Sequence, residues 1–315
     1  MSIRADDLID RRRLRRKLTF WRIVAFAVVV LAIAFATRWL LDEAGVVSSE
    51  HIAQVKITGT ITEDDELIER LDRIRKASAV KGVIVTIDSP GGTTVGGEAI
   101  YEAVRRLASE KPVVAQVGTL AASAGYMIAS ATDHIIARQS SIVGSIGVLF
   151  QYPDVSGLME KLGIKLEEVK SSPLKAEPSP FKPTSEEART MIRSMILDSY
   201  AWFVDLVTER RPLSRAQVLK LADGSVFTGR QAAENKLVDE LGGELEAKAW
   251  LVSKGVAENL EIVEWKKRDS GGSLFLPEVA ARFLGAPSGS ADILRELGAE
   301  RIFLDGLLSV WQPEK

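Results

Sequence analysis

The side chains best suited to nucleophilic chemistry in this chain are serines and lysines, because cysteine is absent and histidine is scarce. The 315 residues include no cysteine and only two histidines, His51 and His134. This composition excludes disulfides, thiolate metal ligands, a cysteine nucleophile and a zinc site built from several histidines. His134 begins an apolar run and His51 precedes the first predicted strand, so neither is expected to act as a base. A serine nucleophile would then need a lysine whose pKa is lowered towards neutrality by desolvation.

Two glycine-bearing turns could hold such a serine. Each follows a predicted buried strand and leads into a predicted helix: one is Asp88-Ser89-Pro90-Gly91-Gly92, and the other spans residues 118–126 and includes Ser123. In open α/β sheets, ligands bind at the carboxyl ends of strands, where helix N-termini offer free N–H groups. Side by side, the turns could supply a nucleophile and an oxyanion hole. Each alone is a weak signal, since Pro-Gly-Gly is usually only a turn and Ser123 could be a packing residue or an N-cap.

Alternating strands and helices must position these turns. Strand patterns cover residues 52–57, 82–87, 112–117 and 134–137, and helical periodicity covers residues 63–76, 96–107, 126–131, 217–221 and 229–236. This βαβ rhythm predicts an α/β fold with helices packed on the sheet.

A proline-rich stretch interrupts the rhythm before a long helix. Residues 173–183 are predicted to form an extended loop. Thr184 followed by Glu187 predicts a capping box that opens a helix reaching about Glu209.

The first 41 residues predict a membrane anchor. A basic tail over residues 1–17 precedes an apolar stretch over residues 18–41, in which Arg22 and Arg38 lie near the ends and can snorkel to the interface. Tryptophans also stand near both ends, as interfacial aromatics do. A cleaved signal peptide is the alternative, but bulky residues follow the apolar core in place of a small-x-small cleavage site. The positive-inside rule then places the N-terminus in the cytoplasm and everything after residue 42 outside.

Five motifs in order resemble the signal peptide peptidase A (SppA) family of bacterial serine proteases, related in fold to Clp protease and the crotonases. They are Asp88-Ser89-Pro90-Gly91-Gly92, Ala121-Ala122-Ser123-Ala124-Gly125-Tyr126, Gly144-Ser145-Ile146-Gly147-Val148, Lys170-Ser171-Ser172-Pro173-Leu174-Lys175, and Gly229-Arg230 with Leu237-Val238-Asp239 and Gly242-Gly243. The resemblance covers about residues 53–250 and, with the anchor, matches short-form members that carry one catalytic domain. It implies a Clp/crotonase-like core of repeated βαβ units.

The resemblance also implies a role for each site residue. Ser123 matches the nucleophile, Lys175 the general base, and Ser145 a hydroxyl that helps to orient the lysine. The backbone N–H groups of Gly92 and Ala124 match the oxyanion hole. The chain has Ala124 and Ser172 where family members often have glycine, and the N–H of residue 124 survives that change. Only the family spacing selects Lys175 over its rivals by position, which are Lys165, Lys170 and Lys182.

The implied protein is a serine endopeptidase with a Ser/Lys dyad, anchored in the bacterial inner membrane with its catalytic domain on the extracytoplasmic side. It would degrade remnant signal peptides and other unfolded or membrane-associated peptides, form a homo-oligomer, and need neither metal nor cofactor. A net charge of −2 gives no global basic field for nucleic acid. The predicted parts are a cytoplasmic tail (1–17), a signal anchor (18–41), a linker (42–52), a protease domain (53–265) and a C-terminal extension (266–315).

Two other functions fit the same fold. A crotonase-like acyl-CoA enzyme shares the oxyanion logic, but it would need neither a nucleophilic serine nor an export anchor. A catalytically inactive, membrane-tethered scaffold would have no reason to retain Ser123, Ser145 and Lys175 together.

Overall fold

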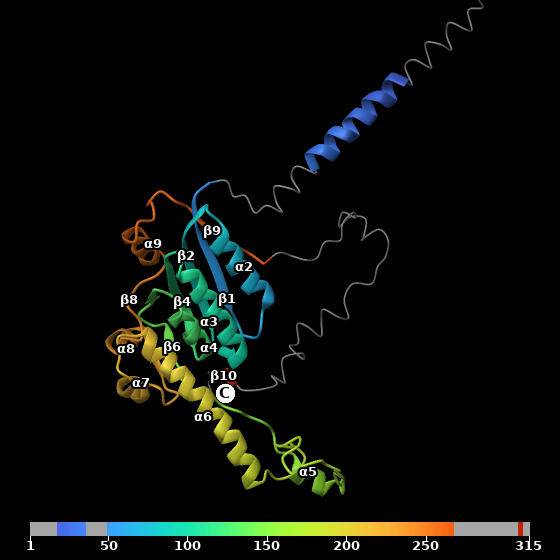
Figure 1. The fold of residues 1–315 in the computed structure, drawn as a ribbon, viewed down its shortest axis with the longest axis vertical. Helices are drawn as coiled ribbons and strands as arrows, with labels where there is room; N and C mark the ends of the chain where they lie inside the picture. The colour runs from blue at the N-terminus through green and yellow to red at the C-terminus, as the bar shows by residue number, and fades with distance from the viewer. Residues whose placement is uncertain (1–17, 36–48, 268–307, 311–315) are drawn as a thin grey trace, which may run out of the picture. The chain divides into compact units, whose positions relative to one another are not determined.

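The computed structural model describes residues 18–35, 49–267 and 308–310 (Figure 1). The chain divides into two compact units, Met1–Ser49 and Glu50–Lys315. In the first unit, the described part is an exposed helix, Leu18–Phe35, long and apolar enough by length and composition to cross a membrane. The predicted basic tail, the end of the predicted anchor, most of the linker and most of the C-terminal extension lie outside the described residues.

The second unit is built on a largely parallel sheet. Its strands are β1 (His51–Thr58), β2 (Val80–Ser89), β4 (Val113–Ala122), β5 (His134–Ala137), β6 (Ile142–Gly144), β7 (Val226–Thr228), β8 (Glu240–Leu241) and β9 (Ile262–Glu264). The order is β7-β6-β4-β2-β1-β9, with β5 pairing β4 and β8, and β6·β7 is the antiparallel pair in this sheet. β4 changes partner along its length, because residues 114–117 pair with β5 and residues 120–122 pair with β6.

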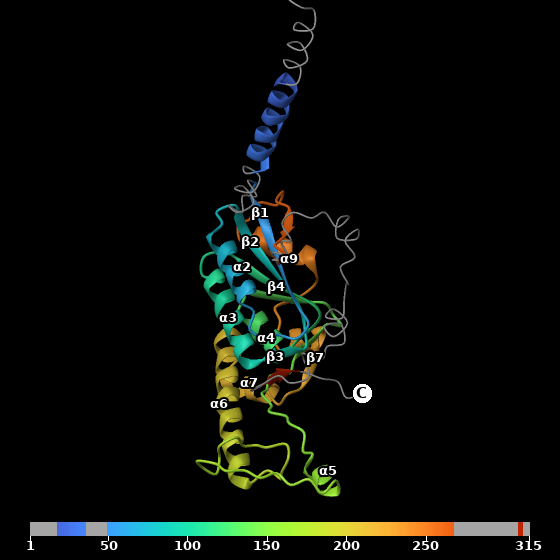
Figure 2. The same ribbon diagram turned by 90° about the vertical axis from the view of Figure 1, so that its right-hand side faces the viewer.

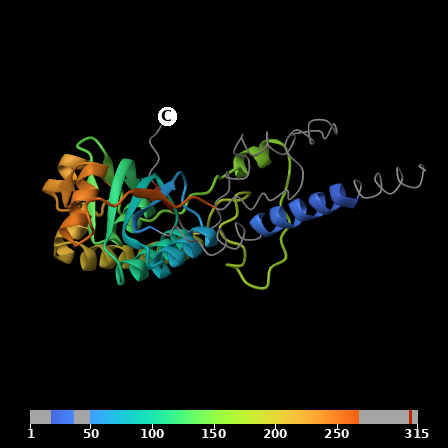
Figure 3. The ribbon, with the colours of Figure 1, turned by 90° about the horizontal axis from the view of Figure 1, so that it is seen from above.

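Helices cover both faces of this sheet (Figure 3). They are α2 (Asp65–Lys76), α3 (Thr94–Ala108), α4 (Ala124–Ser130), α5 (Ser156–Lys161), α6 (Glu186–Arg210), α7 (Arg215–Leu221), α8 (Gly229–Glu234) and α9 (Glu244–Ser253). Successive side chains of a strand point to opposite faces. Val83, Val85 and Ile87 therefore join the larger core cluster with α2, α3 and α4, while Ile84 joins a smaller one with Leu251 of α9.

The predicted α/β alternation is confirmed, with strand and helix ends shifted by a few residues. The capping box predicted at Thr184 is wrong. Ser185 caps α6, because its Oγ accepts a hydrogen bond from the Ala188 N–H at 3.2 Å. The Thr184 hydroxyl instead lies 2.7 Å from the Tyr152 hydroxyl. The sequence patterns did not predict α5, α9 or the short strands β6 to β9. Strands of two or three residues carry little periodicity.

Residues 150–185, here called the arm, include α5. The arm and the N-terminal half of α6 project beyond one end of the sheet (Figures 1 and 2). The buried residues of α6 from Phe203 onwards lie in its C-terminal half, so its first half adds little to the core. The arm also exposes several large apolar side chains, among them Leu158, Leu162, Ile164 and Val169.

Candidate active site

The two glycine-bearing turns meet at the carboxyl edge of the parallel sheet. β2 leads into the short strand β3 (Gly91–Thr93), and β4 leads into Ser123 and α4. Figure 2 shows β3 and α4 at the same end of the unit. A Cβ on Gly125 would lie 3.0 Å from the Ser89 carbonyl oxygen, and a Cβ on Gly97 would lie 3.0 Å from Ala124 Cβ. Because these distances leave little space for a larger side chain, small residues occupy the place where the two turns meet.

Ser123 occupies a strained turn between β4 and α4. Its φ of 58° and ψ of −120° are unusual for a residue other than glycine, and strained backbone of this kind clusters at functional sites. Its N–H donates to the Gly144 carbonyl at 2.8 Å, and its carbonyl accepts from the Met127 N–H at 2.9 Å. The side chain makes no capping hydrogen bond to α4, so the hydroxyl does not serve as an N-cap. Ser123 is 1% exposed, so the fold buries this residue almost completely.

Two backbone N–H groups of the predicted site belong to residues at this end of the sheet, Ala124 and Gly92. Ala124 is the first residue of α4, where an N–H has no partner within its own helix. In β3, the Gly91 carbonyl accepts from the Ile61 N–H and the Thr93 N–H donates to the Ile61 carbonyl, both at 2.8 Å. Because strand polar groups alternate in direction, the N–H and carbonyl of Gly92 face the opposite edge of β3, away from Ile61.

Gly92 cannot be replaced without moving the backbone. A Cβ at this position would lie 1.7 Å from the carbonyl oxygen of Ile61, well inside any permissible contact. The turn is fixed further by Ser89, a fully buried residue whose hydroxyl donates to the Gly59 carbonyl at 2.6 Å and accepts from the Gly91 N–H at 3.0 Å. The sequence placed Ser89 in a motif but did not reveal this bracing role, which depends on the distant residue Gly59.

Ser145 stands on the neighbouring strand end. It follows Gly144, the last residue of β6, which pairs with Ala122 just before Ser123. Ser145 also has a positive φ, 53°, and its N–H donates to the Ser225 carbonyl at 2.7 Å. The structure thus brings Ser123, Ala124, Gly92 and Ser145 to one edge of the sheet.

Lys175 lies elsewhere in the chain, on the arm. Residues 171–176 are all exposed and form a turn closed by a hydrogen bond from the Lys175 N–H to the Ser172 carbonyl at 3.2 Å. Within the described residues, no hydrogen bond or ion pair joins the Lys175 ammonium group to Ser123 or Ser145. The segment between α5 and α6 lies well clear of α4 in both side views (Figures 1 and 2).

Two of the rival lysines are committed to carboxylates. Lys170 Nζ lies 2.6 Å from Glu177 Oε1 and 3.0 Å from Glu168, while Lys182 Nζ lies 2.5 Å from Glu177 Oε1 and 2.7 Å from Glu168. The hydrogen bonds to Glu168 and Glu177 raise the pKa of Lys182 above its ordinary value. Hydrogen bonds from Lys170 and Lys182 lower the pKa of Glu177 to about 2. A lysine held protonated in this way is a poor general base.

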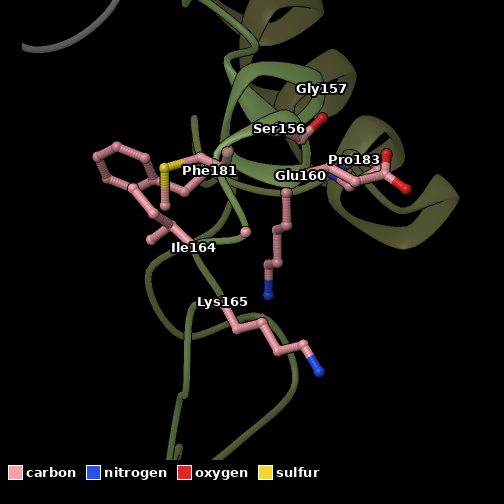
Figure 4. Close-up of a pocket in the computed structure, with 10 residues that line it drawn as sticks. Ser156, Gly157, Glu160, Ile164, Lys165, Phe181 and Pro183 are labelled. Carbon is pink, nitrogen blue, oxygen red and sulfur yellow. The ribbon is translucent and has the colours of Figure 1, made fainter.

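The third rival, Lys165, lines a shallow pocket on the arm with Ile164 and Phe181 (Figure 4). Of the two lysines in the predicted motif, Lys170 is ion-paired. Lys175 is exposed and forms no ion pair with a residue in the described part of the chain.

Both histidines lie away from the serine edge. His51 and His134 are the first residues of β1 and β5, so they stand at the amino ends of parallel strands. His134 stacks on Trp250 with ring centroids 5.1 Å apart, and His51 stacks on Trp265. Neither histidine is therefore placed to act as a base for Ser123 of its own chain.

A strained serine at a strand-to-helix turn, on the carboxyl edge of a parallel sheet, is the arrangement typical of serine hydrolases. Residues 42–142 match the sequence model of Clp protease, and residues 105–256 match that of peptidase family S49. A protein of Methanocaldococcus jannaschii named "putative protease" is 40% identical over 65% of this chain and 66% of its own length. A protein of the same name from Synechocystis is 36% identical over 64% of this chain and 73% of its own length. The "putative signal peptide peptidase SppA" of Enterococcus faecium is 30% identical over 78% of this chain and 76% of its own length.

The chain therefore belongs to peptidase family S49, the SppA family of serine proteases, and its fold is that of Clp protease.

Proposed function

We propose that this protein is a membrane-anchored serine endopeptidase that uses Ser123 as its nucleophile and Lys175 as its general base. The observation that carries the proposal is the strained backbone of Ser123 at the N-terminus of α4. We propose that the N–H groups of Gly92 and Ala124 form the oxyanion hole. Such rigid donors stabilise the oxyanion of a tetrahedral intermediate, and removal of one donor typically slows acyl transfer by about 10²- to 10³-fold.

The reaction follows from these positions. The Ser123 hydroxyl attacks the peptide carbonyl while neutral Lys175 takes its proton. The two N–H groups stabilise the negative charge on the former carbonyl oxygen. Protonated Lys175 then gives its proton to the leaving amine, and an acyl-enzyme remains on Ser123. Lys175 next takes a proton from water, whose attack releases the carboxylic acid and restores the serine.

The position of Lys175 makes a second copy of the chain part of this proposal. The arm, which includes Lys175, projects beyond the end of the sheet (Figure 1) and exposes Leu158, Leu162 and Ile164. Exposed apolar patches of this kind mark interaction surfaces. A homo-oligomer that covers these side chains would deliver Lys175 of one copy to Ser123 and Ser145 of the next, where loss of water would lower its pKa.

The substrates proposed are remnant signal peptides and other unfolded or membrane-associated peptides. The Enterococcus faecium relative is named a signal peptide peptidase. The helix Leu18–Phe35 would tether the protease at the bilayer in which such apolar peptides remain, with the catalytic unit on the extracytoplasmic side of the bacterial inner membrane. The inactive scaffold remains the competing function, because Ser123 and Lys175 are apart within one chain.

The test is peptide hydrolysis by the full-length protein in detergent micelles. A fluorogenic peptide and a synthetic signal peptide would be offered to the wild type, Ser123→Ala, Lys175→Ala and the matched control Lys165→Ala. We expect both site variants to lose at least about 10³-fold in kcat and the control to keep its activity. An inactive wild type of native oligomeric size would favour the scaffold, and an active Lys175→Ala variant would rule out Lys175 as the base.

A further inference from the structure

Strand β4 contains a bulge just before it reaches the turn of the proposed nucleophile. Ile87 of β2 pairs with Val117 of β4, but the next pair in the same ladder joins Ser89 to Ala121. One residue of β2 therefore stands opposite three residues of β4, residues 118–120, here called the bulge. Bulges are rare between parallel strands, and they are common next to active sites, where they redirect a side chain.

The bulge sets how far along the sheet Ser123 lies. In an unbroken ladder Ser89 would pair with Thr119, and every later residue of β4 would stand two places farther along. Two strand residues span about 6.6 Å, whereas a displacement of roughly 1 Å can already cost about a hundredfold in rate. With the bulge, the turn of Ser123 stays level with the turn after β2, since a Cβ on Gly125 would lie 3.0 Å from the Ser89 carbonyl oxygen.

The bulge is also the place where β4 changes its partner strand. Val117 is the last residue of β4 that pairs with β5, and Leu120 is the first that pairs with β6. Within β4, the five residues before the bulge and the two after it are buried, but the bulge itself is not. The core therefore holds both ends of the bulge, and its own shape depends on other contacts.

Two side chains from outside β4 bond to the backbone of the bulge. From β2, an Asp88 carboxylate oxygen accepts a hydrogen bond from the Leu120 N–H at 3.2 Å. From the loop before β6, the Ser141 hydroxyl donates to the Gly118 carbonyl at 2.6 Å and accepts from the Arg138 N–H at 3.0 Å. Ser141 is 2% exposed, so water has little access to replace its bonds, whereas Asp88 is exposed.

We propose that Asp88 and Ser141 are positioning residues, which hold the bulge and thereby set the place of Ser123 against the neighbouring turn. The proposal rests on the proposed function, because only there is Ser123 a nucleophile. Asp88 supplies an accepting oxygen rather than a charge, since its partner is a neutral backbone N–H. Ser141 belongs to none of the five sequence motifs and enters the site through this contact alone.

Two substitutions of Asp88 test this role in the full-length protein in detergent micelles. Asp88→Ala removes the acceptor and should lower kcat for the fluorogenic peptide about tenfold with little change in KM, as a loss of positioning does. Asp88→Asn keeps an accepting oxygen and should retain at least about half of the wild-type kcat. An unchanged kcat in Asp88→Ala, or equal losses in the two variants, would overturn the role of this hydrogen bond.

The matched control for Asp88 is Asp64→Ala. Asp64 also accepts one backbone N–H, that of Leu67 at 3.0 Å, but it does so as the N-cap of α2. We expect this variant to lose stability and to keep its kcat. An equal loss of kcat in Asp64→Ala and Asp88→Ala would show that both act through general stability, against the proposal.

Ser141→Ala tests the other side of the bulge. It leaves a carbonyl and an N–H without their buried partner, so we expect kcat to fall at least about tenfold with KM little changed. Combined with Asp88→Ala, the loss should be smaller than the product of the two single losses, because both residues act through the same bulge. Ser214→Ala, which removes the capping hydroxyl of α7, is the control. Losses that multiply would show that the two residues do not hold one element.

Hydrogen exchange separates this proposal from the proposed function. Amides of residues 118–123 should exchange at least about tenfold faster in Asp88→Ala and Ser141→Ala than in the wild type, and at nearly the wild-type rate in Asp88→Asn. This comparison needs no hydrolysis, so an inactive wild type would sink the protease proposal while exchange still decides whether the bulge is held as proposed. Exchange unchanged in both alanine variants would overturn the role of Asp88 and Ser141, even in an active enzyme.

Discussion

The N–H of Ser123 donates a hydrogen bond of 2.8 Å to the carbonyl of Gly144, which ties the proposed nucleophile to the end of β6. Gly144 has a φ of +109°, and a Cβ there would lie 3.0 Å from both the Phe227 ring and the Ser225 carbonyl oxygen. The conformation of Ser123 thus depends on a glycine in another strand.

Gly144→Ala should therefore impair the enzyme from a distance. We expect about 1–3 kcal/mol of lost stability from the strained backbone, and at least tenfold lower kcat from displacement of Ser123. The matched control is Gly147→Ala, since Gly147 has no positive φ and a Cβ there would meet its nearest atom at 3.8 Å. Thermal unfolding and peptide hydrolysis would be measured together. A fully active Gly144→Ala protein would show that this bond does not position the nucleophile.

A base supplied by a second copy predicts complementation between two inactive variants. Ser123→Ala and Lys175→Ala chains, co-expressed or mixed and reassembled, should recover about a quarter of the wild-type activity, because random mixing pairs an intact serine with an intact lysine at about one site in four. Each variant alone should stay inactive under the same treatment. If native gels show mixed oligomers but the mixtures stay inactive, Ser123 and Lys175 of one site must come from the same chain.

The ion pairs of the arm predict that Glu177 supports the loop that displays Lys175. Glu177→Gln leaves Lys170 and Lys182 sharing Glu168 alone, so the ends of the loop lose their tie. We expect kcat to fall about threefold to tenfold with little change in KM, as for a loss of positioning rather than of binding. Glu187→Gln, at an exposed residue of α6, is the control. An equal effect of both substitutions would indicate a general loss of charge.

The Glu177 carboxylate should also make the stability of the arm fall at acid pH. Because the folded arm lowers the pKa of Glu177 to about 2, its ion pairs stabilise the arm above 4.5 and are lost as the pH falls through the range between 4.5 and about 2. Hydrogen exchange of residues 168–182, calibrated for intrinsic rates, should show protection lost over this range. The Glu177→Gln protein should show a smaller step, because hydrogen bonds from Lys182 and Lys170 also lower the pKa of Glu168. A step of equal size in both proteins would contradict the assignment.

One ion pair away from the proposed active site should contribute strongly to the stability of the second unit. Arg211, whose side chain is 6% exposed, bonds both oxygens of Asp239 at 2.8 and 2.9 Å, and Asp239 also accepts from the Ile135 N–H. Arg211→Met should lower the free energy of unfolding by about 3 kcal/mol, because it leaves a partly buried carboxylate without its partner. Arg215→Met, which breaks an exposed pair with Asp205, should cost less than about 1 kcal/mol. Denaturant titration would measure both, and similar losses would refute the ranking.

The sequence was sufficient for the core and for the serine edge, for local reasons. Val83, Ile84, Val85 and Ile87 form a nearly continuous apolar run, which is typical of a strand buried on both faces. Ser123 could be located because its motif and Gly92 both follow such strands. Their proximity is then a property of parallel topology, since carboxyl ends of parallel strands share one edge.

The parts that the sequence did not reveal depend on contacts between distant residues. Nothing local to Ile61 indicates that it pairs with β3, and nothing local to Ser309 indicates that it lies opposite Gly92. The capping error at Thr184 arose because the adjacent Ser185 is also a good N-cap residue, and it caps the helix without a Glu or Gln three residues later. The projection of the arm, residues 150–185, beyond the end of the sheet is likewise a property of the tertiary structure (Figure 1).

The separation of Ser123 from Lys175 within one chain also bears on how a cell can carry such an enzyme safely. Under the proposed dyad, a newly inserted chain carries both Ser123 and Lys175 but cannot bring them together by itself. Hydrolysis would then rise faster than linearly with the number of copies per area of membrane. At low density in the membrane, the enzyme would leave intact the secreted proteins that pass beside it. Only a region of bilayer with many copies of the enzyme would degrade proteins.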